Sequence, residues 1–206
     1  MTDLTDQKLS IQTEEIQTNG KDTYYCHRYE PTPYAVLDTL FTAFPPSPQD
    51  VLVDYGCGLG RLNFYAEMFY SLRSTGVEFS SSYYTRALEN LQSYNGKKDN
   101  IRFVHCRAEE YIVSPEETIF YFFNPFSIEI FRSVIGHILD SWQESPRMIT
   151  LILYYPEDAY IFYLEHHTVF RRLDEIAASE AIVKDRRERF VLYQLEATHP
   201  CSAGLQ

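Results

Sequence analysis

The sequence lacks the features that mark several common classes of protein. Its 206 residues include four cysteines, and no two of them form a C-x-x-C pair. This spacing argues against a zinc knuckle and against the disulfide framework of a small secreted domain. The chain also has no apolar run of about eighteen residues and no basic stretch followed by an apolar leader. We therefore expect a soluble, cytoplasmic protein with no membrane partner.

Basic residues are few relative to acidic ones. Lys and Arg number 18 against 29 Asp and Glu, so the formal net charge is −11. A surface of this sign repels a phosphate backbone unless its basic residues cluster, which makes nucleic acid an unlikely partner. The same field attracts a basic protein segment or a small amine.

The length of the chain suits one α/β domain with a sizeable core. The N-terminal residues are polar and lack periodicity, as is typical of a loosely held terminus. We therefore expect a flexible segment over residues 1–22, one domain over 23–198 and a short tail over 199–206.

The most informative segment is 51–61, VLVDYGCGLGR, where a buried strand runs into a glycine-rich turn that opens a helix. Gly56, Gly58 and Gly60 stand at alternate positions, which lets a ligand lie against the main chain at the carboxyl end of the strand. A dinucleotide fingerprint needs its third glycine at position 61, where this chain has Arg61. The segment therefore disfavours a nicotinamide dinucleotide as the ligand, and with it an oxidoreductase, and favours another nucleotide-type ligand.

Strand and helix patterns alternate along the rest of the chain. The last two predicted strands are joined by a charged stretch without a full helix, so they should form an antiparallel pair. Apolar periodicity predicts amphipathic helices between most of the earlier strands. We predict strands near residues 51–55, 75–79, 101–105, 118–123, 148–154, 168–173 and 189–195.

The glycine turn with its preceding acid resembles the first motif of S-adenosylmethionine (SAM)-dependent methyltransferases. The resemblance covers nearly the whole chain and is greatest to small bacterial class I enzymes of poorly defined substrate, through segments 29–33 (YEPTP) and 123–126 (FNPF). It implies an α/β fold: a single doubly wound, Rossmann-like, seven-stranded sheet, mostly parallel with an antiparallel final strand, and helices on both faces. It also implies SAM as cofactor and S-adenosylhomocysteine (SAH) as product.

The resemblance also implies residues that hold the cofactor. Glu78, at the end of the second strand, is expected to accept hydrogen bonds from both ribose hydroxyls, and Phe79 to lie on the adenine or else to pack in the core. Asp54 should hold the turn or the methionine ammonium. The full set, which includes residues expected to cover the methionine end and to read the adenine edge, is Tyr29, Thr32, Asp54, Gly56, Cys57, Gly58, Gly60, Glu78, Phe79, Ala108, Glu109 and Asn124.

Segment 124–126 is the candidate catalytic region. Asn124, Pro125 and Phe126 resemble part of the N-P-P-[YF] motif of amino-group methyltransferases, in which the asparagine orients the amine. Capping of the following helix is the alternative role for Asn124. Displacement at a sulfonium needs alignment and exclusion of water but no metal. His166 and His167 have no partner at ligand spacing, so a packing role is favoured for them and no metal site is expected.

The predicted function is transfer of a methyl group from SAM to a nitrogen of a protein lysine or a small-molecule amine. Two alternatives remain open in the sequence. The acceptor can be an oxygen or an RNA, or the chain can be a catalytically silent SAM-binding or sensor domain. No motif bears on the oligomeric state.

Overall fold

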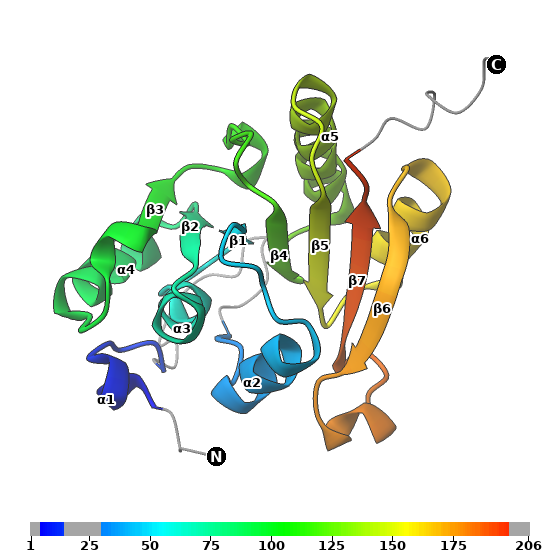
Figure 1. Cartoon of the computed structure of the whole chain (residues 1–206). Helices are drawn as coiled ribbons and strands as arrows, with labels where there is room; N and C mark the ends of the chain where they lie inside the picture. Colours follow the sequence, from blue (N-terminus) through cyan, green and yellow to red (C-terminus); the bar gives the residue numbers. More distant parts are fainter. Residues whose placement is uncertain (1–4, 15–29, 198–206) are drawn as a thin grey trace.

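Seven strands form one sheet in the order β3-β2-β1-β4-β5-β7-β6 (Figure 1). The computed structural model describes residues 5–14 and 30–197. The neighbouring pairs among the first five strands are parallel, whereas β7 is antiparallel to both β5 and β6. These findings confirm the predicted α/β class and the antiparallel final strand. The strands are β1 (Val51–Tyr55), β2 (Arg73–Glu78), β3 (Ile101–His105), β4 (Ile119–Phe123), β5 (Ile149–Tyr154), β6 (Arg171–Ala177) and β7 (Arg189–Leu195).

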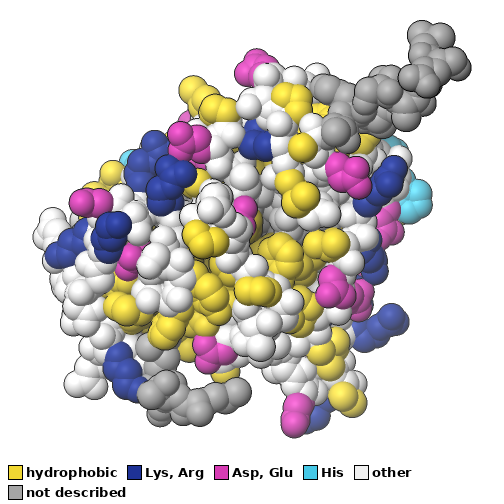
Figure 2. All heavy atoms as spheres, in the orientation of Figure 1, with side chains coloured by type: hydrophobic (Ala, Val, Ile, Leu, Met, Phe, Trp, Pro, Cys, Tyr) yellow, Lys and Arg dark blue, Asp and Glu magenta, His cyan; other side chains and the backbone are white. Residues whose placement is uncertain are grey.

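Helices cover both faces of the sheet and divide the core into two hydrophobic clusters. The first four α-helices pack on one face, and α5 and α6 pack on the other. In the orientation of Figure 1, hydrophobic side chains gather across the middle of the visible face (Figure 2). The helices are α1 (Asp6–Leu9), α2 (Tyr34–Ala43), α3 (Arg61–Tyr70), α4 (Ser81–Ser93), α5 (Ile128–Glu144) and α6 (Asp158–His167), with short 3-10 helices η1 (Lys98–Asn100), η2 (Ala108–Glu110) and η3 (Glu180–Val183).

The central strands are buried along their whole length because both of their faces are covered. Every residue of β1 and of β5 is buried. The strand order reverses at β1, which lies between β2 and β4. In open α/β sheets a ligand crevice forms at this reversal, outside the carboxyl ends of the strands. The fold therefore places the glycine turn, which follows β1, at the edge where a ligand binds.

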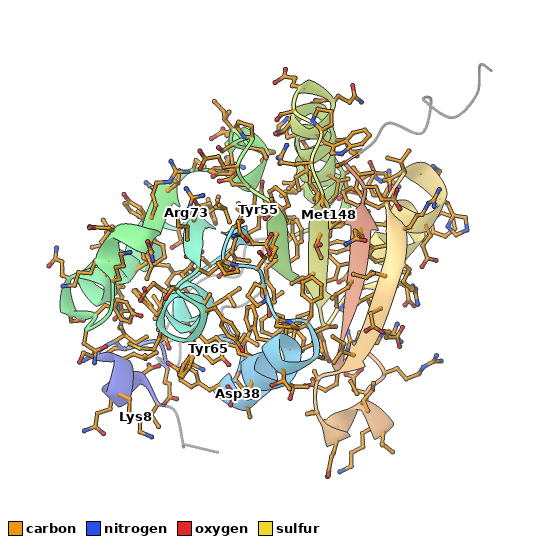
Figure 3. All side chains as sticks on the ribbon, in the orientation of Figure 1. Lys8, Asp38, Tyr55, Tyr65, Arg73 and Met148 are labelled. Atoms are coloured by element: carbon orange, nitrogen blue, oxygen red, sulfur yellow. The ribbon has the colours of Figure 1, made fainter. Side chains whose placement is uncertain are left out.

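Helices α2 and α3 are joined by polar contacts as well as by packing. The Tyr65 hydroxyl on α3 donates to the Asp38 carboxylate on α2 over 2.5 Å, and the two side chains point toward one another (Figure 3). The Tyr65 ring also stacks on Phe41 of α2, with the ring centres 5.6 Å apart. These contacts hold the middle of α3 against α2.

The structure departs from the predicted elements in three places. Strand β6 begins at Arg171, about three residues later than predicted, because the edge strand is exposed along most of its length and carries little alternation. Helix α6 was not predicted, since aromatic and apolar residues lie all round it. Strands β3 and β4 are joined by the 3-10 helix η2 in place of a full helix.

The described part of the N-terminal segment is packed, contrary to our expectation of a loose terminus. Leu9 is 1% exposed and Ile11 is 4% exposed, and both belong to the first hydrophobic cluster. Two apolar residues among polar ones in residues 5–14 are too weak a pattern to predict this packing. The division of the chain at residues 22 and 198 stays a prediction. None of the helices in residues 5–14 and 30–197 is long and apolar enough to cross a membrane.

Candidate functional site at the glycine turn

The glycine turn connects β1 to α3 and is fixed on the neighbouring strand. Gly56, Gly58 and Gly60 all have left-handed φ angles, 76°, 55° and 88°. The amides of Gly56 and Cys57 donate to the carbonyl of Val77 in β2 over 2.9 and 3.2 Å. The turn is therefore a rigid extension of the sheet.

Two of the three glycines make room for side chains of the protein itself. A Cβ at Gly60 would lie 2.5 Å from the ring of Phe103, and a Cβ at Gly56 would lie 2.8 Å from Cβ of Pro125. Gly56 and Gly60 are thus required by packing, and the role of the three glycines toward a ligand stays a prediction. Contact with Pro125 also brings the loop after β4 directly against the turn.

Glu78 links the glycine turn to the end of β2. The residue is 7% exposed, and its Oε2 accepts from the Gly58 amide over 3.0 Å while its Oε1 accepts from the Ser80 amide over 2.7 Å. Burial raises the pKa of this carboxyl, and the hydrogen bonds from the backbone oppose that shift. Glu78 thus lies beside the turn, as predicted. Its two contacts with backbone amides hold the carboxylate in one orientation.

Asp54 lies on β1, beside Gly76 of β2. Burial, followed by the negative charge of Glu78, raises the pKa of Asp54 to about 8. Two carboxyl groups therefore share a buried region with little compensating positive charge. A cation bound at this edge of the sheet would favour the ionised form of both.

The buried Asp54 should make stability fall as pH rises. Its pKa is higher in the folded than in the unfolded chain, so the folded protein holds the extra proton between about pH 4 and pH 8. Over that window each pH unit costs the wild type up to about 1.4 kcal/mol. We expect Asp54→Asn to flatten this dependence, with a melting temperature at pH 8.5 above that of the wild type. Thermal unfolding from pH 5 to 8.5 measures it, and parallel curves for the two proteins would contradict it.

The predicted adenine side is more open. Phe79 follows Glu78 and is 43% exposed, so its ring is not part of the core. This finding removes core packing as the alternative role for Phe79. Ala108 and Glu109 lie in η2, after β3, and the Glu109 carboxylate is 3.6 Å from a guanidinium nitrogen of Arg107. The His105 ring, missed by the sequence analysis, contacts the Phe79 carbonyl over 3.0 Å.

The segment before α2 reaches the site from the face of the sheet on which the first four α-helices pack. Thr32 is buried, and its hydroxyl is 2.8 Å from the hydroxyl of Tyr121 on β4. Thr32 is thus joined to the sheet through Tyr121, a buried residue that no sequence pattern singled out. Tyr29 lies outside the described residues.

Asn124 follows β4 in an unusual backbone conformation. Its φ is 40°, and its side-chain Oδ1 is buried without a hydrogen-bond partner in the part of the chain that the structure describes. Helix α5 begins at Ile128 with Ser127 as its N-cap, so Asn124 is not the cap of that helix. Phe126 is buried, and its carbonyl accepts a hydrogen bond from the hydroxyl of Tyr160. The loop thus holds the amide oxygen of Asn124 in a buried position with no partner among the described residues.

Tyr155 is the counterpart of Asn124 at the end of the next strand. Phe123 is in register with Tyr154, so the residues that follow them are neighbours, and Tyr155 also has a left-handed φ, 51°. Two such non-glycine residues at adjacent strand ends mark a strained region of the kind that clusters at functional sites. The Tyr155 hydroxyl donates to Asp185 and accepts from the guanidinium of Arg187 over 2.8 Å.

The connection between β6 and β7 forms a wall beside this region. The Tyr154 hydroxyl donates to the Glu188 carboxylate over 2.9 Å, which adds a second contact between β5 and this connection. His166 and His167 lie at the end of α6, away from these contacts. The ring of His166 stacks on Phe162 with the centres 4.3 Å apart, in line with the packing role that the sequence favoured.

The fold was compared with known proteins. No protein-family model matches the sequence, and a search of curated proteins gives no match. Solved structures do match. The human methyltransferase 10 domain containing protein has a TM-score of 0.60 and 12% identity, over 83% of this chain and 86% of its own. The N-terminal domain of human METTL16 in complex with SAH has a TM-score of 0.58 and 12% identity, over 94% and 78%.

A bacterial structure gives the same result. The RNA methyltransferase from Salinibacter ruber in complex with SAH matches with a TM-score of 0.52 and 19% identity, over 86% of this chain and 99% of its own. At these identities the likeness concerns the fold. The chain therefore has the seven-stranded, Rossmann-like fold of these methyltransferases.

Proposed function

We propose that this protein is a SAM-dependent methyltransferase that acts on a nitrogen of a protein lysine or a small amine. The observation that carries the proposal is the carboxylate of Glu78, held between the amides of Gly58 and Ser80 at the strand reversal of the sheet. This is the arrangement that a ribose needs, because the carboxylate is fixed in direction before the ligand arrives. Preorganisation of this kind lowers the cost of binding.

The residues present fit the cofactor. A carboxylate oxygen has two acceptor positions, so each oxygen of Glu78 can accept one ribose hydroxyl in addition to its backbone amide. SAM carries two cationic groups, a sulfonium and an ammonium. Without a ligand, burial raises the pKa values of Asp54 and Glu78. A cationic ligand would favour the ionised form of both carboxyl groups, which would then supply negative charge to it. SAM when bound supplies the electrophilic methyl group.

The geometry of Asn124 supports nitrogen as the acceptor atom. A buried amide oxygen without a partner costs free energy, and an N–H donor from the acceptor would satisfy it. Such a hydrogen bond also directs the lone pair of the acceptor nitrogen, which is the alignment that displacement at a sulfonium requires. Pro125, packed on Gly56, keeps this oxygen close to the turn.

RNA is the second candidate acceptor. The matched structures include proteins named as RNA methyltransferases, one of them a putative tRNA methyltransferase from Streptococcus pneumoniae. The net charge of −11 opposes this candidate, because a phosphate backbone is repelled by an acidic surface. The catalytically silent SAM-binding domain is the remaining alternative.

Calorimetry and labelling test the proposal in sequence. We expect the purified protein to bind SAM and SAH and not NAD. Incubation with SAM labelled on its methyl group should then transfer label to the protein or small-amine fraction of a cell extract, and not to its RNA. Label in RNA alone would contradict the proposed acceptor. Binding of SAH without transfer to any fraction would favour the silent domain, and absence of SAH binding would end the SAM proposal.

Glu78→Gln should weaken SAH binding by about 1.5–3 kcal/mol, roughly ten- to hundredfold. The substitution removes the charge from the ribose contacts. In addition, the side-chain amide nitrogen of the new glutamine must face one of the two backbone N–H groups that now donate to Glu78. Calorimetric titration with SAH measures the change. Glu89→Gln, on the exposed side of α4, is the matched control and should bind like the wild type. Unchanged affinity in Glu78→Gln would move the ribose contact elsewhere, and Glu109→Gln is the variant to measure next.

A further inference from the structure

Arg61 occupies a position where an arginine is unfavourable. It is the first residue of α3, directly after Gly60, and it is only 6% exposed. The positive end of a helix dipole repels a cation, and a buried guanidinium is costly unless it has partners. An arginine at this place therefore indicates that its contacts serve a purpose that an apolar residue could not.

The partners of Arg61 come from the N-terminal segment and from the chain before α2. Its Nε donates to the Thr13 hydroxyl over 2.7 Å, and its Nη1 donates to the Thr32 carbonyl over 3.4 Å. Its Nη2 is 3.6 Å from a carboxylate oxygen of Asp6 and 3.5 Å from one of Glu14. One side chain thus draws two separate stretches of sequence to the first turn of α3.

The partners of Arg61 also form hydrogen bonds with one another. The Thr13 hydroxyl donates to Asp6 over 2.7 Å, and the Tyr34 hydroxyl donates to the same carboxylate over 2.5 Å. The guanidinium of Arg61 lies over the Tyr34 ring, 4.6 Å from its centre. Thr13 is fully buried. The N-terminal segment is therefore fixed by polar contacts as well as by Leu9 and Ile11.

Asn90 joins the same segment to the glycine turn from the other side. Its Oδ1 accepts from the Gln12 amide over 2.8 Å, and its Nδ2 donates to the Gln12 carbonyl over 3.1 Å. The same Nδ2 donates to the carbonyl of Leu59, between Gly58 and Gly60, over 3.0 Å. Asn90 is 5% exposed. A single amide thus holds the backbone of the N-terminal segment and the backbone of the turn.

We propose that Arg61 and Asn90 are positioning residues, through which residues 5–14 hold the glycine turn in the geometry that binds the cofactor. We call residues 5–14, with these contacts, the N-terminal clamp. The part of this inference that concerns the cofactor rests on the proposed function. The mechanical link between the clamp and the turn does not.

The clamp and the cofactor should stabilise one another. If both favour the same conformation of the turn, each increases the affinity of the other by the same factor. SAH should therefore slow amide hydrogen exchange within residues 5–14. Loosening of the clamp should in turn speed exchange at the amides of Gly58 and Gly60 in the unliganded protein and weaken SAH binding.

Thr13→Val is the variant that loosens the clamp with the least change in shape. It removes the hydroxyl that accepts from Arg61 and donates to Asp6, and it lies far in sequence from the turn. We expect SAH to bind about tenfold more weakly and exchange at Gly58 and Gly60 to become several-fold faster. Thr39→Val is the matched control, because its hydroxyl donates to the Ala35 carbonyl within α2. It should change neither quantity.

Asn90→Asp provides a second variant that keeps the acceptor for Gln12 and removes the two donors. It should reproduce both effects of Thr13→Val. Unchanged exchange at the turn in both variants would overturn the proposal and leave the segment as a cover for the core, even if melting temperatures fall. If the wild type binds no SAH, the proposed function fails, and faster exchange at the turn in the unliganded variants still decides whether the clamp exists.

Discussion

Gly58→Val should abolish SAH binding, with a loss of at least about a hundredfold in affinity. Gly58 has a φ of 55°, a conformation that a β-branched residue adopts only at a cost of about 1–3 kcal/mol. Its amide is the donor that orients Glu78. The substitution therefore moves the turn and the carboxylate together, and it also fills space where we place the ligand against the main chain.

The control for this result is a glycine with open space around it. Gly136 lies in α5, and a Cβ there would meet nothing within 4 Å. Gly136→Ala should bind SAH like the wild type and be somewhat more stable, because alanine favours a helix over glycine. Circular dichroism should show that Gly58→Val retains the secondary structure of the wild type. Gly58→Ala, with a smaller side chain, should still bind far more weakly than the wild type. Wild-type affinity in the valine variant would mean that the ligand does not lie at this turn.

Asn124→Ala should slow methyl transfer about a hundredfold while it changes SAH affinity by no more than a few-fold. Loss of one orienting hydrogen bond at a transition state has an effect of this size. The lost contact is to the acceptor and is used at the reacting centre, so binding of the cofactor is spared. The rate is measured on the fraction that accepts label from SAM.

The left-handed backbone of Asn124 provides a discriminating second variant. Alanine is strained at a φ of 40°, whereas glycine is not. Asn124→Gly removes the same amide and relieves the backbone, so it should be as slow as Asn124→Ala and at least as stable as the wild type. Equal rate losses in the two variants assign the effect to the amide. A glycine variant with wild-type activity would show that the backbone, and not the side chain, is what matters at this position.

The parts of the fold that the sequence predicts are those with local signals. The buried strand before Gly56, the acid that ends β2 and strand β7 all have patterns that can be read within a few residues. Strand β6 begins later than predicted because it lacks such a local signal. The bounds of an exposed edge strand depend on pairing with its partner more than on its own residues. Helix α6 has no polar stripe and therefore no helical period in its hydrophobic residues.

The site was predicted in the same uneven way. Glu78 and the glycines could be placed by their spacing along the chain. The roles of Arg61, Asn90 and Thr13 depend on contacts between residues 48 and 78 positions apart, which no local pattern encodes. Asn124 could be read as a cap or as an orienting residue from the sequence. The start of α5 at Ile128, with Ser127 as its N-cap, excludes the first role, and the second stays a proposal.

The position of β7 has a consequence for the order in which the sheet is completed. During synthesis the chain emerges from its N-terminus, so β5 and β6 are available before Arg189–Leu195. β7 lies between them and is their shared neighbour. Within the described sheet, β6 has no other strand to pair with, so its backbone groups stay open until the last strand arrives. This part of the sheet is therefore completed only once β7 is available, and until then β5 and β6 present unpaired edges to other chains.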